Sequence, residues 1–240
     1  PVCAFAQFTE TFDGPEIDSN NLWEGDLSDF QITDDGWLSL VGDPDKKYSR
    51  LKISLPYSNN MEWKFDVKMT FTPSDPNHIR FYLLTENLSL LGISSEYYIQ
   101  IGSTKKTITL RRFRETEKAP VRIIEKELDV LKQNIVSLSV KVTLENSSLW
   151  SLYVREEGES TYTLLDTKEQ KISSGIKYIE SGLACHYSKK VRGHFIDNIE
   201  ISSNITPSEE KPENPDTEEP VSPVVLPKLL SVQPLNLCEL

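Results

Sequence analysis

Two carboxylates in the sequence stand among apolar residues, where a charge requires a partner. Strand side chains alternate between two faces, so in FIDNIEI Asp197 falls in the same row as the phenylalanine and the last two isoleucines. Glu10 lies in the same way between the two phenylalanines of FTETF. An unpaired buried carboxylate is costly or takes up a proton. The alternatives are an ion pair with Arg192 or a lysine, hydrogen bonds to loop amides, a shared cation, or a strand less buried than its pattern indicates.

Aromatic residues near loops are candidates for sugar binding, because rings stack on pyranose faces beside polar groups. Trp23 lies in the loop-like sequence NNLWEGDLSD, and Tyr48 and Tyr57 flank the strand-like SRLKISLP. These side chains are the candidates for binding carbohydrate, although for Trp23 packing in the core is the favoured interpretation. The basic segment 111–118 is open to two interpretations, contact with an acidic glycan or an exposed hairpin.

The catalytic patterns of all-β sugar enzymes are absent or incomplete. The E-x-D-x-x-E pattern of laminarinase-type hydrolases comes closest at Glu127 and Asp129, but Lys132 takes the place of the second glutamate. The sequence has no G-x-S-x-G elbow, P-loop or histidine-pair metal motif. The residue types of a polysaccharide lyase do gather in one region, at His78, Arg80, Tyr82 and Tyr98. Ordinary sheet surface is the preferred explanation for them, and we predict a protein without catalytic activity.

Most of the chain shows the period of β-strands. Alternating apolar and polar residues predict about a dozen strands, and the segment 121–134 fits a strand followed by a loop better than a short helix. Many short strands without intervening helices indicate an all-β, two-sheet antiparallel jelly-roll sandwich. The predicted strands cover residues 8–12, 37–40, 49–55, 62–71, 78–84, 96–102, 106–113, 134–144, 149–154, 161–166, 181–187 and 193–201.

The charge and composition of the chain exclude several partners. The formal net charge is -11, which disfavours nucleic acid and anionic lipid, because both select an excess of Lys and Arg. No apolar run reaches the about 20 residues of a membrane-spanning helix. The cysteines lie in separate segments and predict neither a disulfide framework nor a zinc site.

Changes in composition divide the chain into segments. The sequence AFA before Gln7 fits the end of a secretory signal peptide, so residues 1–6 are predicted to be a signal remnant, with a frayed terminus as the alternative. Residues 7–204 are predicted to form the jelly-roll domain. The acidic, proline-rich residues 205–223 predict an extended linker. Residues 224–240 turn apolar again and predict the truncated first strand of a further C-terminal domain.

Several stretches resemble a secreted Bacteroidetes module, a concanavalin A-like jelly roll of the laminin-G type. They are FTETFDG, LWEGDLSDFQITDDGWLSL, YYIQIGSTKKTITLRRF, LWSLYVREEGESTYTLLD and ACHYSKKVRGHFIDNIEI. The resemblance covers residues 7–204 and implies an adhesive module that precedes lamin-tail or immunoglobulin-like domains. PKLLSVQPLNL resembles the opening strand of such an immunoglobulin-like domain. Carbohydrate binding follows from the resemblance by analogy only.

The resemblance also bears on the acids in apolar rows. In concanavalin A-like jelly rolls the first and last strands are neighbours, and several carbohydrate-binding members hold a structural calcium ion with an acid from each strand. Calcium accepts carboxylate and loop carbonyl oxygens. The resemblance thus implies a structural calcium site at Glu10 and Asp197, with Asp13 as a further ligand. Because a ligand of the folded state stabilises it, calcium is expected to raise the melting temperature.

Taken together, these features favour a non-catalytic, exported module that binds carbohydrate or adheres to a surface, as part of a larger cell-surface protein. The expected partner is a glycan or a surface protein. A structural spacer is the second interpretation. A polysaccharide-degrading enzyme, either a glycoside hydrolase or a lyase, is the third. A groove lined with rings favours the first, and a cleft with clustered acids favours the third.

Overall fold

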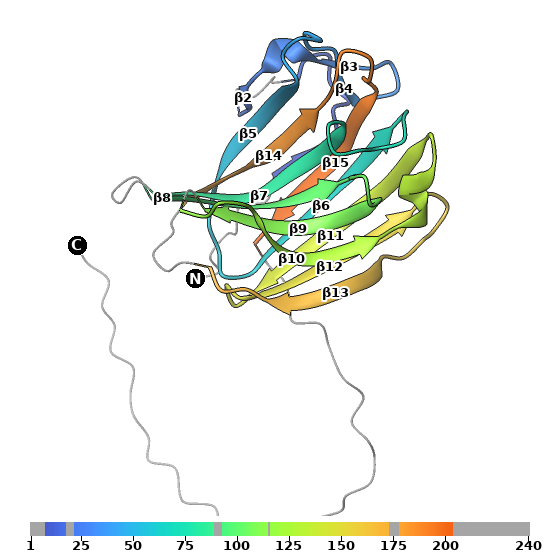
Figure 1. Cartoon of the computed structure of the whole chain (residues 1–240). Coiled ribbons are helices and arrows are strands. Elements are labelled where there is room, and N and C mark those ends of the chain that lie inside the picture. The colour runs from blue at the N-terminus through green and yellow to red at the C-terminus, as the bar shows by residue number, and fades with distance from the viewer. Residues whose placement is uncertain (1–7, 18–21, 89–92, 115, 173–177, 204–240) are drawn as a thin grey trace, which may run out of the picture. The chain divides into compact units, whose positions relative to one another are not determined.

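The computed structural model describes residues 8–17, 22–88, 93–114, 116–172 and 178–203. These residues form two antiparallel sheets and two short 3-10 helices, Leu27–Asp29 (η1) and Asp129–Lys132 (η2). Figure 1 shows the sheets as two layers. The predicted all-β, two-sheet antiparallel jelly-roll fold is confirmed.

The chain divides into two units, residues 1–206 and 207–240. The second unit lies outside the described residues. So do the predicted signal remnant, the predicted linker and the predicted strand of a following domain. The division of the chain into segments therefore stays a prediction.

Each sheet joins strands that are distant in the sequence. The eight-stranded sheet has the order β13 (Thr163–Glu169), β12 (Leu149–Glu156), β11 (Val136–Glu145), β6 (Met61–Met69), β15 (His194–Ser202), β4 (Leu38–Leu40) and β3 (Phe30–Ile32), and β1 (Phe8–Glu10) also pairs with β15. The seven-stranded sheet has the order β10 (Val121–Glu127), β9 (Thr107–Arg114), β8 (Ile93–Ile101), β7 (His78–Leu88), β14 (Tyr178–His186), β5 (Tyr48–Pro56) and β2 (Glu24–Gly25).

The strand pattern of the sequence agrees with these elements. Segment 121–134 forms β10 followed by η2, as expected for a strand and a loop. The first and last strands are neighbours, because Phe8 lies opposite Ile201 and Glu10 lies opposite Ile199. Two short strands were not predicted. β2 has two residues, which is too short for an alternating pattern to appear, and β3 has three.

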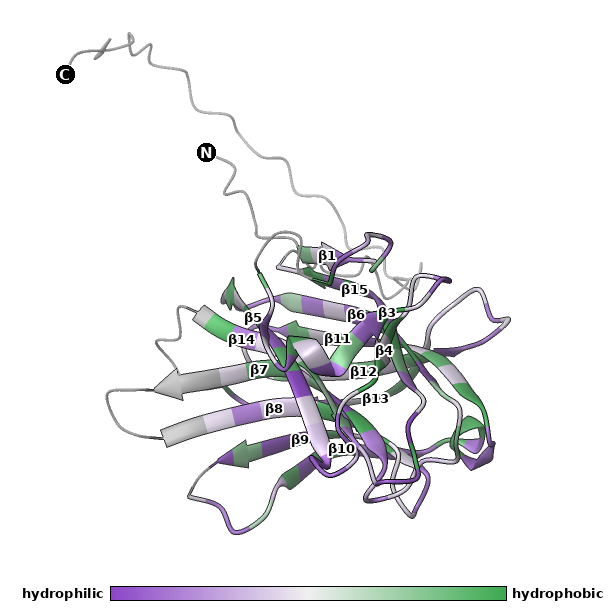
Figure 2. Ribbon diagram, turned by 90° about the horizontal axis from the view of Figure 1, so that it is seen from above, coloured by the Kyte–Doolittle hydropathy of each residue, from purple (hydrophilic) through white to green (hydrophobic). Residues whose placement is uncertain are grey.

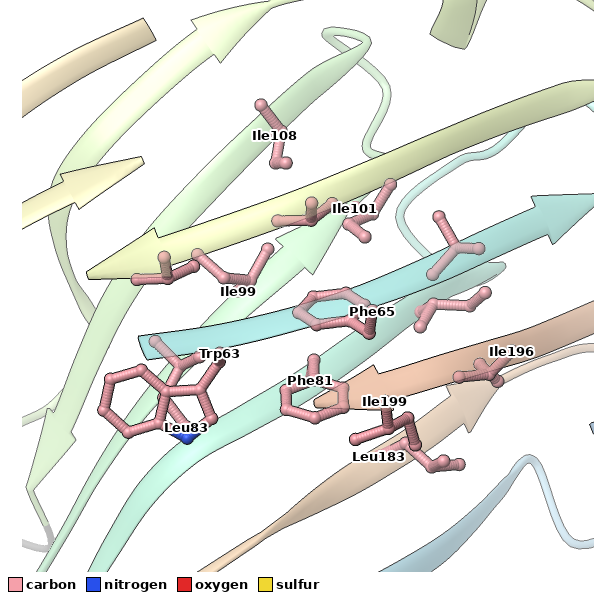
Figure 3. Packing of buried hydrophobic residues seen from close by; sticks show 14 of the residues in the cluster. Trp63, Phe65, Phe81, Leu83, Ile99, Ile101, Ile108, Leu183, Ile196 and Ile199 are labelled. Carbon is pink, nitrogen blue, oxygen red and sulfur yellow. The ribbon is translucent and has the colours of Figure 1, made fainter. Parts of the chain in front are cut away.

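The core lies between the sheets and follows from alternation along the strands. β6 alternates buried and half-buried residues throughout its length, and Figure 2 shows hydropathy changing in the same way along several strands. Phe65 of β6 stacks on Phe81 of β7, with ring centroids 4.0 Å apart. Figure 3 shows these two rings meeting among the isoleucines and leucines of both sheets. The core therefore fixes which side chains of each sheet face outward.

Candidate functional site

The outer face of the seven-stranded sheet carries a row of aromatic rings. His186 of β14 lies opposite His78 of β7 on one side and opposite Tyr48 of β5 on the other. The rings of His78 and His186 stack with centroids 4.3 Å apart, and those of His186 and Tyr48 stack at 5.6 Å. Tyr48 ends the row and is 48% exposed. Strand pairing thus builds a stack of three rings whose last member faces solvent.

A second group on the same face pairs arginines with tyrosines. The guanidinium carbon of Arg50 lies 4.4 Å from the ring centroid of Tyr82, and that of Arg80 lies 5.0 Å from the ring centroid of Tyr98. The two tyrosine rings are 5.4 Å apart. We call this surface, with the ring stack, the arginine–tyrosine face. Its members are Tyr48, Arg50, His78, Arg80, Tyr82, Tyr98, Arg111 and His186.

Two small residues of β14, Gly182 and Ala184, lie between the longer side chains that β5 and β7 contribute to the arginine–tyrosine face. Ala184 lies between Arg50 and Arg80 in the register, and Gly182 lies between Lys52 and Tyr82. Neither Gly182 nor Ala184 fills the space above its strand. The longer side chains of β5 and β7 therefore lean over β14, as the approach of Arg50 to Tyr82 shows.

The charges on this face are partly compensated. Arg50 lies 4.0 Å from Glu96, and Lys52 pairs with Glu180 at 2.6 Å and with Glu24 at 3.5 Å. Arg80 donates from Nε to Nε2 of His78 at 3.1 Å. Within the described part of the chain, Arg80 and Arg111 form no ion pair with a carboxylate.

Burial sets the protonation of the ionisable rings. It lowers the pKa of His78 to about 3 and that of His186 to about 4, with the neighbouring Arg80 acting in the same direction. Both imidazoles are therefore neutral at pH 7. His78 donates from Nδ1 to the carbonyl oxygen of Asp75 at 2.8 Å. Burial raises the pKa of Tyr98, which keeps its hydroxyl protonated.

The lyase-type cluster predicted around residues 78–101 is brought together, but its side chains support one another. Both ring nitrogens of His78 are engaged in hydrogen bonds. Tyr98 is 1% exposed and lies beneath Arg80. Both groups are thus held by neighbouring protein groups in this arrangement.

The incomplete hydrolase pattern is also accounted for locally. Glu127 and Asp129 both pair with Lys132, at 2.9 Å and 2.8 Å. Glu127 ends β10 and Asp129 begins η2, so the two carboxylates lie at a strand end and are held by one lysine. These residues form a surface ion-pair group.

The three predicted sugar-binding aromatics do not meet in one site. Tyr48 is exposed and belongs to the arginine–tyrosine face. Tyr57 follows the opposite end of β5, where its hydroxyl donates to Ser147 Oγ at 2.9 Å. Trp23 is only 4% exposed and packs against Phe8 and Phe12 with ring centroids 5.7 Å and 6.2 Å away. Trp23 thus lies in the core, which corrects its expected role as a loop aromatic.

The basic segment 111–118 divides between two surfaces. Arg111 faces outward as the cross-strand partner of Tyr98. Arg112 forms an ion pair with Glu117, whose other oxygen accepts from the Arg114 backbone amide at 3.2 Å. Only Arg111 of these arginines therefore joins the arginine–tyrosine face. Sequence reasoning missed the face as a unit, because its members come from separate strands.

Asp197 does not point into the core, contrary to the alternation of its strand. The register of β15 against β6 shifts between Asp197 and Glu200, and Asn198 has a φ of 49°. The bulge changes which face each residue takes. Asp197 lies opposite Asp66, on the outward side of β6, while Ile199 beyond the bulge returns to the core.

The carboxylates predicted to hold calcium lie near one another without forming a metal site. Burial raises the pKa of Asp197 to about 6, and the charges of Asp66, Asp13 and Glu10 add to the shift. Asp197 accepts from the Asn198 amide at 2.8 Å, and Glu10 accepts from the Phe12 amide at 3.0 Å. In the described residues, no group of three or more His, Cys, Asp or Glu side chains is placed to hold a metal ion. Backbone amides engage Glu10 and Asp197, and the calcium site at Glu10, Asp13 and Asp197 stays a prediction.

We expect Asp197→Asn to raise the free energy of unfolding by about 1–2 kcal/mol near pH 7.5, a value reduced for solvent screening. The folded state raises the pKa of Asp197 from 3.8 to about 6, so the ionised side chain opposes folding above that pH. The gain should disappear as the pH falls through this range, because Asp197 then becomes protonated. Urea unfolding at several pH values measures both effects.

The exposed Asp34→Asn provides the matched control for this prediction. It removes one negative charge without changing a buried group, so we expect no gain. A loss of stability in Asp197→Asn at neutral pH would contradict the electrostatic account. A calcium-dependent rise in melting temperature that Asp197→Asn abolishes would support the predicted calcium site.

Comparison with known proteins identifies the fold. No protein-family profile and no curated protein matches the sequence. Among solved structures, the carbohydrate recognition domain of Emp47p has a TM-score of 0.58 at 9% identity, and the match covers 85% of this chain and 99% of that one. The carbohydrate-binding module CBM66 from Bacillus subtilis has a TM-score of 0.52 at 13% identity, covering 76% of this chain and 98% of that one. The metal-free lectin I-B4 from Griffonia simplicifolia has a TM-score of 0.56 at 13% identity, covering 83% and 100%.

These likenesses define the class of the fold. The structural neighbours are lectin-like, concanavalin A-like jelly-roll domains, one of them bacterial. At such low identities the likeness concerns the fold, and function must be argued from the site. The expected Bacteroidetes origin, laminin-G type and neighbouring domains stay predictions.

Proposed function

We propose that this chain is a non-catalytic carbohydrate-binding module, and that its glycan lies across the arginine–tyrosine face. The observation that carries the proposal is the exposed ring of Tyr48 at the end of the stack, beside the guanidinium groups of Arg50 and Arg80. Rings bind the apolar faces of sugars, and guanidinium groups donate several hydrogen bonds to oxygen. The lectin and carbohydrate-binding neighbours support this choice of ligand.

The supporting packing makes the surface preorganised. Tyr48 is held by stacking on His186, which in turn stacks on His78. Arg50 and Arg80 are held over tyrosine rings. Side chains that are already ordered lose less conformational entropy when a ligand binds. A glycan would therefore meet a fixed ring and fixed donors.

The role of the module in a larger protein is part of the same proposal. We place it in a secreted or cell-surface protein, where it would attach the protein to a glycan or to a surface protein. The support is the signal-like sequence before Gln7, which lies outside the described residues. Within the described residues, no helix is long and apolar enough to cross a membrane.

A panel of immobilised polysaccharides tests the proposal. We expect retention on at least one polysaccharide, and we expect Tyr48→Ala to weaken it about tenfold, which corresponds to the loss of one stacking contact. Tyr153→Ala is the matched control, because Tyr153 lies in β12 of the other sheet. Equal losses for the two variants would place binding elsewhere.

The same panel separates the alternative functions. Absence of binding to every polysaccharide would favour a structural spacer. New reducing ends or unsaturated products would favour a polysaccharide-degrading enzyme. Retention without new products supports the binding module.

A further inference from the structure

The arginine–tyrosine face concentrates positive charge in an acidic protein. The whole chain has a formal net charge of -11. Arg50 and Arg80 nevertheless both reach over the Tyr82–Tyr98 pair, from β5 and from β7. Arg111 lies directly opposite Tyr98 on β9. Two guanidinium groups thus lie over two rings whose centroids are 5.4 Å apart, and Arg111 is the cross-strand neighbour of one of these rings.

The carboxylates near this face do not neutralise all of its arginines. Glu96 lies 4.0 Å from Arg50, and Glu180 is engaged by Lys52 at 2.6 Å. His78 and His186 carry no charge at neutral pH because burial lowers the pKa of each. Like charges at close range repel unless a counter-charge is supplied. Arg80 and Arg111 form no ion pair with a carboxylate among the described residues, and Asp75, on which the charge of Arg111 acts, is hydrogen-bonded to Thr104.

The geometry points to an acidic polysaccharide as the ligand, with sugar carboxylates bound by Arg80 and Arg111 and a sugar ring stacked on Tyr48. This inference rests on the proposed carbohydrate-binding function and specifies its ligand. Guanidinium groups present planar pairs of donors that match a carboxylate. A neutral glycan would leave these charges uncompensated. The chain's net negative charge disfavours acidic polymers in general, so their binding requires a local cluster of positive charge such as this face.

The test compares polygalacturonate with its methyl ester, since esterification removes the charge and keeps the sugar backbone. We expect the acid form to bind about tenfold or more tightly than the ester. Arg80→Gln and Arg111→Gln should each weaken binding to the acid form about tenfold and reduce its dependence on salt. Lys141→Gln is the matched control, because Lys141 covers Tyr153 at 4.2 Å on the other sheet. Circular dichroism and urea unfolding establish that each variant is folded.

The outcomes separate the inference from the proposed function. Equal binding of acid and ester, unchanged in Arg80→Gln and Arg111→Gln, overturns the acidic ligand and leaves carbohydrate binding in place. Tighter binding of dextran sulfate than of polygalacturonate overturns the choice of carboxylate over sulfate. If single-stranded DNA is retained as strongly as polygalacturonate, the acidic-polysaccharide ligand is overturned, because the face then binds polyanions in general. Binding of none of these polymers, nor of any neutral polysaccharide, removes both proposals.

Discussion

Acidification from about pH 7 to pH 5 is expected to destabilise this domain by several kcal/mol. The chain has only three histidines, and the structure places all of them close together. His78 stacks on His186, and His194 donates from Nε2 to the carbonyl oxygen of His186 at 2.9 Å. Burial lowers the pKa of His78 to about 3, and those of His186 and His194 to about 4. The folded state therefore disfavours the charged form of each ring.

The surroundings of the histidines explain the direction of these shifts. Arg80 faces His78 and His186, and its charge opposes protonation of both. His194 is fully buried and packs between Phe71 and Tyr187, with ring centroids 4.7 Å and 6.4 Å away. A charge in this apolar environment would be poorly solvated.

The sign of the effect follows from the protons bound in each state. Between the lowered pKa values and the ordinary value of 6.5, the unfolded chain binds more protons than the folded one. The histidine contribution to the free energy of unfolding is therefore fully present above about pH 6.5. It falls as the pH decreases, by up to about 2 kcal/mol per buried histidine at pH 5. Asp197 acts in the opposite direction, since its pKa is raised to about 6. One partly screened carboxyl does not offset three histidines.

Urea unfolding between about pH 7.5 and pH 5 measures the effect before most carboxylates titrate. His194→Gln keeps a donor for the His186 carbonyl and cannot become charged, so its stability should depend less steeply on pH. His186→Phe keeps a ring between Tyr48 and His78 and should act in the same way. A free energy of unfolding that is constant over this range would contradict the account.

The fold could be predicted from the sequence because burial on one face repeats along each long strand. β6 shows this most clearly, with five buried residues at alternate positions. Such a pattern depends only on neighbours within one strand. Strand β2 was missed because two residues cannot show a period, whereas β3 is as long as β4, which the sequence predicted.

The site could be predicted only in part, because it depends on pairing between strands. Tyr48 was identified as a candidate, but its neighbours His78 and His186 lie 30 or more positions away, and only the register brings them together. The expected place of Asp197 was wrong for the converse reason. A one-residue bulge at Asn198 reverses the alternation, and the residue types around it give no sign of that.

Gly182→Ala is expected to separate β14 from β5 locally and to lower the free energy of unfolding by about 3 kcal/mol or more. A β-carbon at this position would lie 2.1 Å from the carbonyl oxygen of Leu51 and 2.7 Å from the α-carbon of Lys52. Both atoms belong to the backbone of β5, so no side-chain rotation relieves the overlap. Because β14 lies between β5 and β7, displacement of β5 also moves Tyr48 and Arg50 away from β7.

Gly158→Ala is the matched control for this prediction. Gly158 has a φ of 89° and no atom within 4 Å of the added carbon, so only backbone strain of about 1 kcal/mol opposes the change. Urea unfolding of the two variants compares steric overlap with strain alone. Polysaccharide binding is then measured on the folded fraction of each variant. Loss of binding in Gly182→Ala but not in Gly158→Ala would show that the close packing of β14 on β5 positions the binding side chains. Equal stability of the two variants would show that β5 can move aside, and the close approach of β14 to β5 would then have no structural consequence.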